Sequence, residues 1–123
     1  MNKSAGTVLA VLLFFGLPMV RAFVQNAPVV SDSDAIKYAG RSVAVEGTVA
    51  KAFKSKNGNV FLDFGGTYPN ETFVAWIPVD APEAADSGLL SLQGKKVKVS
   101  GTIQLYRDKP EIKVMTKEQI IVE

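Results

Sequence analysis

Two stretches of this chain carry the same pattern: Gly40 to Val49 reads GRSVAVEGTV, and Gly94 to Ile103 reads GKKVKVSGTI. In each stretch, valines recur at every second position, which is the period of a strand with one buried face. Each stretch also has a glycine in its middle, Gly47 or Gly101, and a glycine inside a strand is typical of a bulge or a bend. Two copies do not make a repeat array, which needs at least about three units. We therefore expect two equivalent, bent strands in one strongly curved sheet.

Three further strands are predicted from short apolar runs. Two of them, VFLDF at 60–64 and TFVAWI at 72–77, flank the loop GGTYPN at 65–70, and the last covers 111–115. The turn before the first of these runs contains Asn57-Gly58, which is a strong hairpin signal. The mature chain therefore has five predicted strands.

Short helices are predicted at 83–92 and at 35–39, where Gly40 is a suitable residue to end the helix. An apolar tail follows at 118–122. After the helix at 35–39, the order of elements is strand, strand, strand, helix, strand, strand. This order predicts an all-β fold, the five-stranded Greek-key barrel known as the OB-fold. The helix between the third and fourth strands distinguishes this fold from an SH3-like barrel.

The first 22 residues have the three parts of a secretory signal peptide. Lys3 gives a basic start, residues 8–20 are almost wholly apolar, and Val20-Arg21-Ala22 places small residues at the cleavage positions. The apolar run is shorter than the roughly 20 residues that a membrane-spanning helix needs, although an uncleaved anchor remains the alternative. We therefore expect a periplasmic or secreted protein with no stable membrane insertion after cleavage. Its predicted parts are a signal peptide (1–22), an extended N-terminal segment (23–34) and an OB-fold domain (35–123).

The composition excludes several classes of enzyme. The chain has 123 residues with 14 Lys+Arg, 12 Asp+Glu, no Cys and no His, so catalysis by Ser-His-Asp or Cys-His groups is excluded. Removal of residues 1–22 leaves 12 basic and 12 acidic residues, so the mature chain is formally neutral. Asp63, Glu71 and Asp80 lie apart in the sequence, with no spacing that forces them together. We therefore predict no enzymatic activity, no catalytic residues, no metal site and no cofactor.

Several motifs resemble a known family. GRSVAVEG at 40–47, VFLDFGGTYPN at 60–70 and GKKVKVSGTIQLY at 94–106 are similar to the exported bacterial OB-fold proteins that are usually described as nucleic-acid-binding. VFLDF is also similar to the second strand of the anticodon-binding barrels of class II tRNA synthetases. The resemblance covers most of 35–121 and implies the OB-fold. It also implies that Phe61 occupies the position at which an aromatic ring stacks on a base in those barrels.

The second and third strands of an OB-fold form its usual binding face. Alternation directs Val60, Leu62 and Phe64 into the core, so Phe61 and Asp63 are predicted to face outward. The same alternation directs Trp76 outward from the next strand. Phe61 and Trp76 are therefore candidate stacking platforms for bases. The alternative is that neighbouring segments cover both rings and make them part of the packing.

Basic residues are predicted on both sides of this face. Lys51, Lys54 and Lys56 lie around the first hairpin, and Arg107 and Lys109 lie in the last one. Such cations favour phosphate groups because each neutralised phosphate releases counterions. The residues together predict a monomeric module that binds single-stranded nucleic acid. The alternative is a module whose barrel face binds a protein partner in the cell envelope, or a small ligand.

Overall fold

The computed structural model describes residues 27–123. The predicted signal peptide and the first residues of the predicted N-terminal segment lie outside the described residues. Within the described part, the chain forms eight strands and four short 3-10 helices. The strands are β1 (Val29–Ser31), β2 (Ser42–Lys54), β3 (Val60–Phe64), β4 (Phe73–Ile77), β5 (Lys96–Thr102), β6 (Gln104–Tyr106), β7 (Lys109–Lys113) and β8 (Ile120–Val122). The 3-10 helices are η1 (Asp32–Tyr38), η2 (Pro82–Ala85), η3 (Ser87–Leu92) and η4 (Lys117–Gln119).

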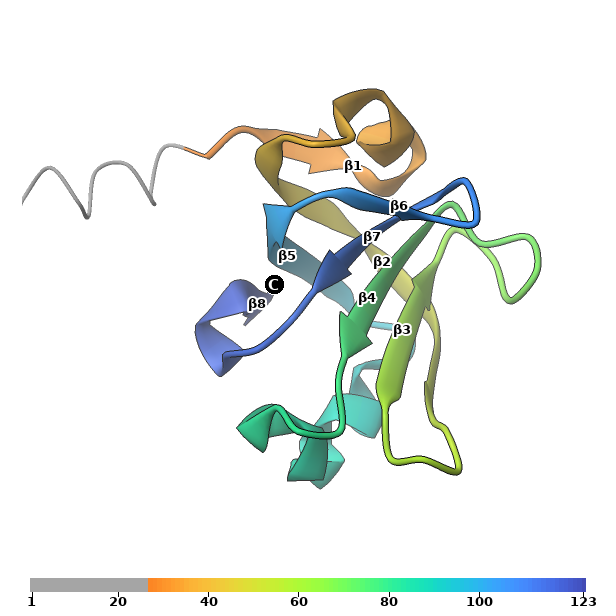
Figure 1. The fold of residues 1–123 in the computed structure, drawn as a ribbon, viewed down its shortest axis with the longest axis vertical. Helices are drawn as coiled ribbons and strands as arrows, with labels where there is room; N and C mark the ends of the chain where they lie inside the picture. The colour runs from red at the N-terminus through yellow and green to blue at the C-terminus, as the bar shows by residue number, and fades with distance from the viewer. Residues whose placement is uncertain (1–26) are drawn as a thin grey trace, which may run out of the picture.

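The eight strands form one mixed sheet. Its order is β6-β7-β4-β3-β2-β5-β8, and β1 pairs with β2 beside this path. The β1–β2 and β4–β7 pairs are parallel, and the other pairs are antiparallel. Figure 1 shows η1 at one end of the sheet and the segment with η2 and η3 at the other end. The prediction of a mainly β protein with few short helices is confirmed.

Each of the five predicted strands has a counterpart, in β2, β3, β4, β5 and β7. The first strand was predicted to end at Val49, but β2 continues to Lys54. A register shift between Val49 and Lys51 interrupts the alternation there, because a bulge changes which residues share a face. The remaining strands, β1, β6 and β8, have only three residues each. That length is too short to show a period of two.

The helix predicted at 83–92 is two separate 3-10 helices, η2 and η3. They meet at Asp86, whose backbone is extended (φ −76°, ψ 112°) and whose side chain accepts a hydrogen bond from the Gly88 N–H at 2.8 Å. An Asp that caps the following turn in this way stops the preceding helix. The helix predicted at 35–39 begins earlier, at Asp32, where Ser31 accepts a hydrogen bond from the Asp34 N–H.

The two repeats of the sequence pair with each other. β2 and β5 are antiparallel, with Val45 opposite Val99 at the centre of the pair. The hydrogen bonds at the two ends are equivalent: Gly40 N–H donates to the Ile103 carbonyl at 2.8 Å, and Gly94 N–H donates to the Val49 carbonyl at 2.7 Å. The repeats are therefore related by an approximate twofold axis through the middle of the pair.

The same equivalence extends to the turn before each strand. Arg41 N–H donates to the Tyr38 carbonyl, and Lys95 N–H donates to the Leu92 carbonyl, both at 2.9 Å. The glycine in each turn, Gly40 or Gly94, has a φ of +84°. This is the third position of a type II turn, which requires a positive φ and therefore favours glycine. The repeat thus consists of a 3-10 helix, a glycine turn and a strand.

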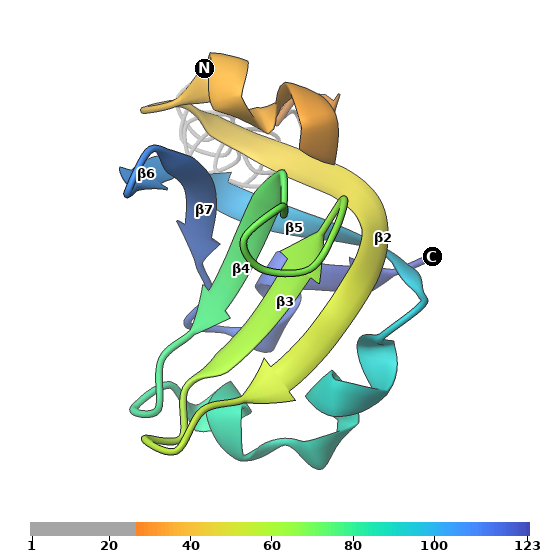
Figure 2. The ribbon, with the colours of Figure 1, turned by 90° about the vertical axis from the view of Figure 1, so that its right-hand side faces the viewer.

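β2 holds the two parts of the sheet together. Its first half pairs with β5 up to Thr48, and its second half pairs with β3 from Val49 onward; Figure 2 shows it as one long curved strand. Gly47 lies just before this change of partner, where a Cβ atom would be 2.7 Å from Asp32 Oδ1. At Gly101, a Cβ atom would be 2.6 Å from Ile112 Cγ2. Both predicted mid-strand glycines therefore occupy places where another side chain approaches the backbone.

Residues from every part of the sheet build one hydrophobic core. On the outer face of β3 and β4, Asp63 and Val74 are also buried, with 3% and 8% exposed, and the side chains that alternation directs into the core are fully buried. These are Val60, Leu62, Phe64, Phe73, Ala75 and Ile77. The opposite face of β3 and β4 is then left for the candidate site.

Candidate ligand-binding face

A row of aromatic rings crosses the outer face of three adjacent strands. Phe53 on β2 is directly opposite Phe61 on β3, and Phe61 is directly opposite Trp76 on β4. The rings of Phe53 and Phe61 are stacked, with centroids 5.2 Å apart and an interplanar angle of 21°. All three residues are half-buried. We refer to these three side chains as the aromatic row.

A lysine lies at each end of the aromatic row. Lys51 Nζ lies 5.5 Å from the centroid of the Phe53 ring, and Lys113 Nζ lies 5.4 Å from that of Trp76. Lys113 is directly opposite Trp76 in the β4–β7 pair. A cation within about 6 Å of a ring centroid is attracted by the negative face of the ring. The register of four strands therefore produces a strip of rings that begins and ends with a positive charge.

A cavity of about 330 Å³ opens beside the aromatic row. Phe53 and Phe61 lie on one side, and Tyr68 and Tyr106 come from the 65–72 loop and from β6. The cavity is lined by Phe53, Phe61, Asp63, Tyr68, Pro69, Glu71, Val74, Tyr106, Arg107, Lys109 and Glu111. Because three carboxyl groups line it, we refer to it as the acidic pocket.

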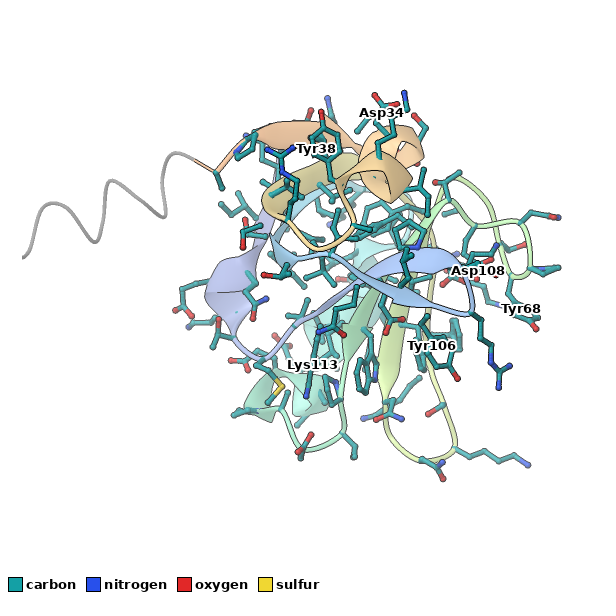
Figure 3. The ribbon with its side chains drawn as sticks, turned by 45° about the horizontal axis from the view of Figure 1, so that its top comes forward. Asp34, Tyr38, Tyr68, Tyr106, Asp108 and Lys113 are labelled. Atoms are coloured by element: carbon teal, nitrogen blue, oxygen red, sulfur yellow. The ribbon has the colours of Figure 1, made fainter. Side chains whose placement is uncertain are left out.

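The 65–72 loop and the β6–β7 hairpin approach each other at the acidic pocket. Figure 3 shows Tyr68 on the loop and Tyr106 on the hairpin on the same side of the molecule, with Asp108 at the hairpin tip. Tyr68 is 75% exposed and Tyr106 is 56% exposed. Two exposed tyrosine rings beside one cavity give it an accessible aromatic rim.

Asp63 is the most deeply buried acidic group of the described chain. It faces outward from β3, as predicted, but only 3% of it is exposed, and Tyr68, Pro69 and Glu71 of the 65–72 loop line the same cavity. Burial, and then the nearby Glu71 carboxylate, raise the pKa of Asp63 to about 6. Its Oδ2 is buried without a hydrogen-bond partner. A buried acceptor without a partner is rare in folded proteins and therefore requires an explanation.

The other two carboxyl groups of the acidic pocket differ in their surroundings. Lys109 Nζ donates to Glu71 Oε1 at 2.8 Å, to the Glu71 carbonyl at 3.0 Å and to the Pro69 carbonyl. Glu71 is thus a buried partner in an ion pair. Glu111 is half-buried and forms no ion pair among the described residues, and burial raises its pKa. Lys109 therefore compensates one of the three carboxyl groups and ties β7 to the loop.

Arg107 lies in the tight turn between β6 and β7. Arg107 and Asp108 have φ values of 51° and 67°, and Tyr106 is paired with Lys109. Two central residues with positive φ define the type I′ turn of a two-residue hairpin. Pro110 is paired with Leu105, so this proline already belongs to the strand. The turn holds the exposed Arg107 side chain at the mouth of the acidic pocket.

The structure brings most of the predicted site residues together, but not all of them. Phe61, Asp63, Arg107 and Lys109 line the acidic pocket. Phe61 and Trp76 also line a second cavity of about 380 Å³ beside β6. Lys51 belongs to β2 rather than to the hairpin loop, and it lies over Phe53.

The two remaining lysines lie elsewhere. Lys54 is opposite Val60, which points into the core, so Lys54 stands on the other face of the sheet from Phe61. Lys56 lies in the exposed turn after β2. Neither of them lines either cavity. The structure thus does not support their placement beside the predicted binding face.

Four important residues of this face were not among the predicted site residues. They are Phe53, Lys113, Tyr106 and Glu111. Phe53 was missed because the first strand was predicted to end before it. Lys113 and Glu111 alternate with the buried Ile112, so the fifth strand already carried the signal that they share one face. The spacing of Asp63 and Glu71 likewise gave no indication that both line one cavity.

Two further findings concern the described residues as a whole. Among residues 27–123, no group of three or more Asp or Glu side chains is placed to hold a metal ion. Over the same residues, no helix is long and apolar enough to cross a membrane.

The fold is similar to part of a known structure. The chain matches a crystal structure from Leishmania major Friedlin, provisionally described as an aspartyl-tRNA synthetase, with a TM-score of 0.54 and 13% sequence identity. The match covers 79% of this chain and 21% of that chain, so this protein corresponds to about a fifth of the length of the synthetase. The likeness concerns the fold alone. No family model and no curated protein sequence matches the chain.

Proposed function

We propose that this protein is a non-enzymatic OB-fold module that binds single-stranded nucleic acid on the outer face of β3 and β4. The observation that carries the proposal is the aromatic row, which places Phe53, Phe61 and Trp76 at opposed positions on adjacent strands. Stacking of one base on an aromatic ring contributes about 1–3 kcal/mol and tolerates any base. A row of half-buried rings can therefore support successive bases of an unpaired strand.

The charges around the row support the same ligand. Lys51 and Lys113 lie at its two ends, and Arg107 lies at the mouth of the acidic pocket. Bases on the rings would leave the phosphates at the edges of the strip, close to these cations. Ion pairs with phosphate make such binding dependent on salt.

The proposed barrel rests on the order of the strands and on one close contact. Closure of the sheet into a barrel requires β5 to meet β7, because these two strands lie toward opposite ends of the strand order. Gly101 of β5 faces Ile112 of β7 so closely that a Cβ atom would be 2.6 Å away. The likeness to a structure described as a tRNA synthetase, a class of protein that acts on an RNA, is in keeping with this fold and with a nucleic-acid ligand.

We further propose that the protein acts as a monomer outside the cytoplasm, in the periplasm or as a secreted protein. The signal-peptide pattern of residues 1–22 supports this localisation. A domain boundary near residue 35 is also part of the proposal, although β1 at Val29–Ser31 pairs with β2 and adds the preceding segment to the sheet.

The proposal is tested by titration of the protein with a labelled single-stranded oligonucleotide, with Trp76 fluorescence as a second signal. Phe61→Leu removes the ring but keeps an apolar side chain, so we expect the affinity to fall about 5- to 150-fold while the protein stays folded. Phe61→Tyr restores a ring and is expected to bind like the wild type. Wild-type protein that binds no oligonucleotide at low salt would refute the proposal.

A matched pair of lysine variants tests the placement of the ligand. Lys113→Ala removes the cation beside Trp76, whereas Lys54→Ala removes an exposed lysine on the opposite face. We expect the first variant to weaken oligonucleotide binding and the second to leave it unchanged. Equal effects of the two variants would contradict binding on the outer face.

One observation favours a protein partner as a second candidate. β6 is an edge strand, and its Leu105 and Tyr106 are 52% and 56% exposed beside Trp76. An exposed edge with apolar side chains can pair with an added strand of another protein. A Leu105→Lys variant that loses a partner in a pull-down, together with wild-type protein that binds no oligonucleotide, would favour this candidate.

A further inference from the structure

The Asp63 carboxyl group lies on the same face of β3 as the Phe61 ring, where it can contact a group that stacks on that ring. It lies two residues after Phe61 on the same strand, so the two side chains share the outer face and are separated by about 6.6 Å along β3. Both line the acidic pocket. A flat group that stacks at Phe61 would therefore present its edge to the Asp63 carboxyl.

The unpartnered oxygen defines what that edge must supply. Asp63 is 3% exposed, and its Oδ2 makes no hydrogen bond with any described residue. A buried acceptor without a partner destabilises the free protein, and a donor from a ligand would remove that cost. The pocket therefore favours a ligand with an N–H donor at its edge.

Among the charged groups around the acidic pocket, Asp63 is the carboxyl group best placed to accept a hydrogen bond from a ligand beside Phe61. Glu71 is already bound to Lys109 through a contact of 2.8 Å. Lys51 is directly opposite Asp63 in the β2–β3 pair, but its Nζ lies over the Phe53 ring, and Glu111 lines the same cavity as a second acceptor. A ligand edge that carries an acceptor instead of a donor would meet these carboxyl oxygens unfavourably.

Nucleobases differ in this feature. Cytosine carries an amino group at the position where thymine carries a carbonyl oxygen, and Asp or Glu side chains accept hydrogen bonds from the cytosine amino group. The two pyrimidines stack in a similar way, although thymine also carries a C5 methyl group and has an N3–H donor where cytosine has an acceptor nitrogen. The inferred contact concerns the 4-position, where cytosine offers Asp63 a donor and thymine offers it an acceptor.

We infer that the acidic pocket is a base-edge subsite in which Asp63 accepts a hydrogen bond from the exocyclic amino group of an unpaired base, so that cytosine is bound in preference to thymine. This inference rests on the proposed binding of single-stranded nucleic acid. It adds selectivity to the aromatic row, which by itself tolerates any base. The aromatic row supplies affinity, and the acidic pocket supplies the preference.

The test compares oligodeoxycytidine and oligothymidine of equal length, at about pH 8 and fixed salt. We expect the wild type to bind oligodeoxycytidine about 5-fold more tightly, the lower end of the range for a bidentate base contact, because a single hydrogen bond is made here. Asp63→Asn is expected to lose most of this preference, because the amide can donate to the thymine carbonyl. Asp80→Asn, at an exposed residue outside both cavities, is the matched control and should keep it.

The outcomes separate this inference from the proposed function. Equal binding of the two oligonucleotides by the wild type would overturn the inference and leave the proposed function intact. A preference for cytosine that persists in a folded Asp63→Asn variant would also overturn it. Binding of neither oligonucleotide would overturn both. A preference that is present in the wild type and in Asp80→Asn, and lost in Asp63→Asn, would support the inference.

Discussion

Asp63 shows how far the position of a single residue can depend on chain that is distant in sequence. Alternation along VFLDF indicates that its side chain leaves the core, and this is correct. The 65–72 loop lines the same cavity as the carboxyl group, and Lys109 bonds to this loop through Glu71 and two backbone carbonyls. The sequence of the strand does not indicate that this loop lies beside the carboxyl group. The altered acidity of Asp63 is therefore a property of the fold rather than of the strand.

The raised pKa of Asp63 predicts a pH dependence of stability. The ordinary pKa of an aspartate side chain is 3.8, and that of Asp63 in the folded protein is about 6. Between these values the folded state binds more protons than the unfolded state, so this group's contribution to the free energy of unfolding falls as the pH rises. The contribution is fully present below the lower value and is lost above about pH 6.

Asp63→Asn removes this titration. We expect the stability of the variant relative to the wild type, measured by urea denaturation, to be greater at about pH 7 than at about pH 4. Lys51, Lys109 and Glu71 face the carboxyl group and are unchanged in the variant. A difference in stability that is the same at both pH values would contradict the prediction.

At the scale of elements, the repeated unit of 3-10 helix, glycine turn and strand determines the middle of the sheet. The same hydrogen bonds close both turns, and the strands that follow pair around Val45 and Val99. The two copies of the repeat in the sequence are thus related by an approximate twofold axis in the structure. The repeat alone predicted two equivalent strands, but it did not place them side by side.

The equivalence of the turns can be tested with one substitution in each. Gly40 and Gly94 both have a φ of +84°, and no heavy atom lies within 4 Å of an added Cβ atom at either position. Gly40→Ala and Gly94→Ala should therefore cost about 1–2 kcal/mol each, from backbone strain alone. The measurement is urea denaturation, with Ala39→Ser in the same turn as the control, at φ −54°. Clearly unequal costs would contradict the equivalence.

At the scale of the whole molecule, the sequence predicted the parts of the fold better than the site. Alternation and turn residues define the five main strands, because these signals lie within a few neighbouring residues. The place of Phe53 depends on a bulge in β2, and the Lys109–Glu71 pair joins residues far apart in the sequence. Such features arise only when distant strands meet. The sequence therefore predicted Phe61 and Trp76 but not the pocket beside them.

The distribution of charge predicts a modest salt dependence of binding. For a single-stranded ligand, the slope of log K against log salt concentration is about −0.7 for each phosphate that the protein neutralises. Lys51, Lys113 and Arg107 would thus give a slope of about −2 in a plot of log K against log salt concentration. Lys113→Ala should reduce the magnitude by about 0.7, and Lys54→Ala should not change it. A slope near zero in the wild type would show that these cations do not contact phosphate.

The twofold relation between the repeats has a consequence for molecules that fold in each other's presence. A strand built to pair with a near copy of itself can also pair with the same strand of a second chain. Residues 40–49 of two chains would present matching Val-x-Val faces and identical glycine turns to each other. Exchange of this kind links chains into swapped dimers. Refolding at low protein concentration favours pairing of β2 with β5 of the same chain, because the two strands are tethered to each other. Refolding at high protein concentration favours exchange between chains.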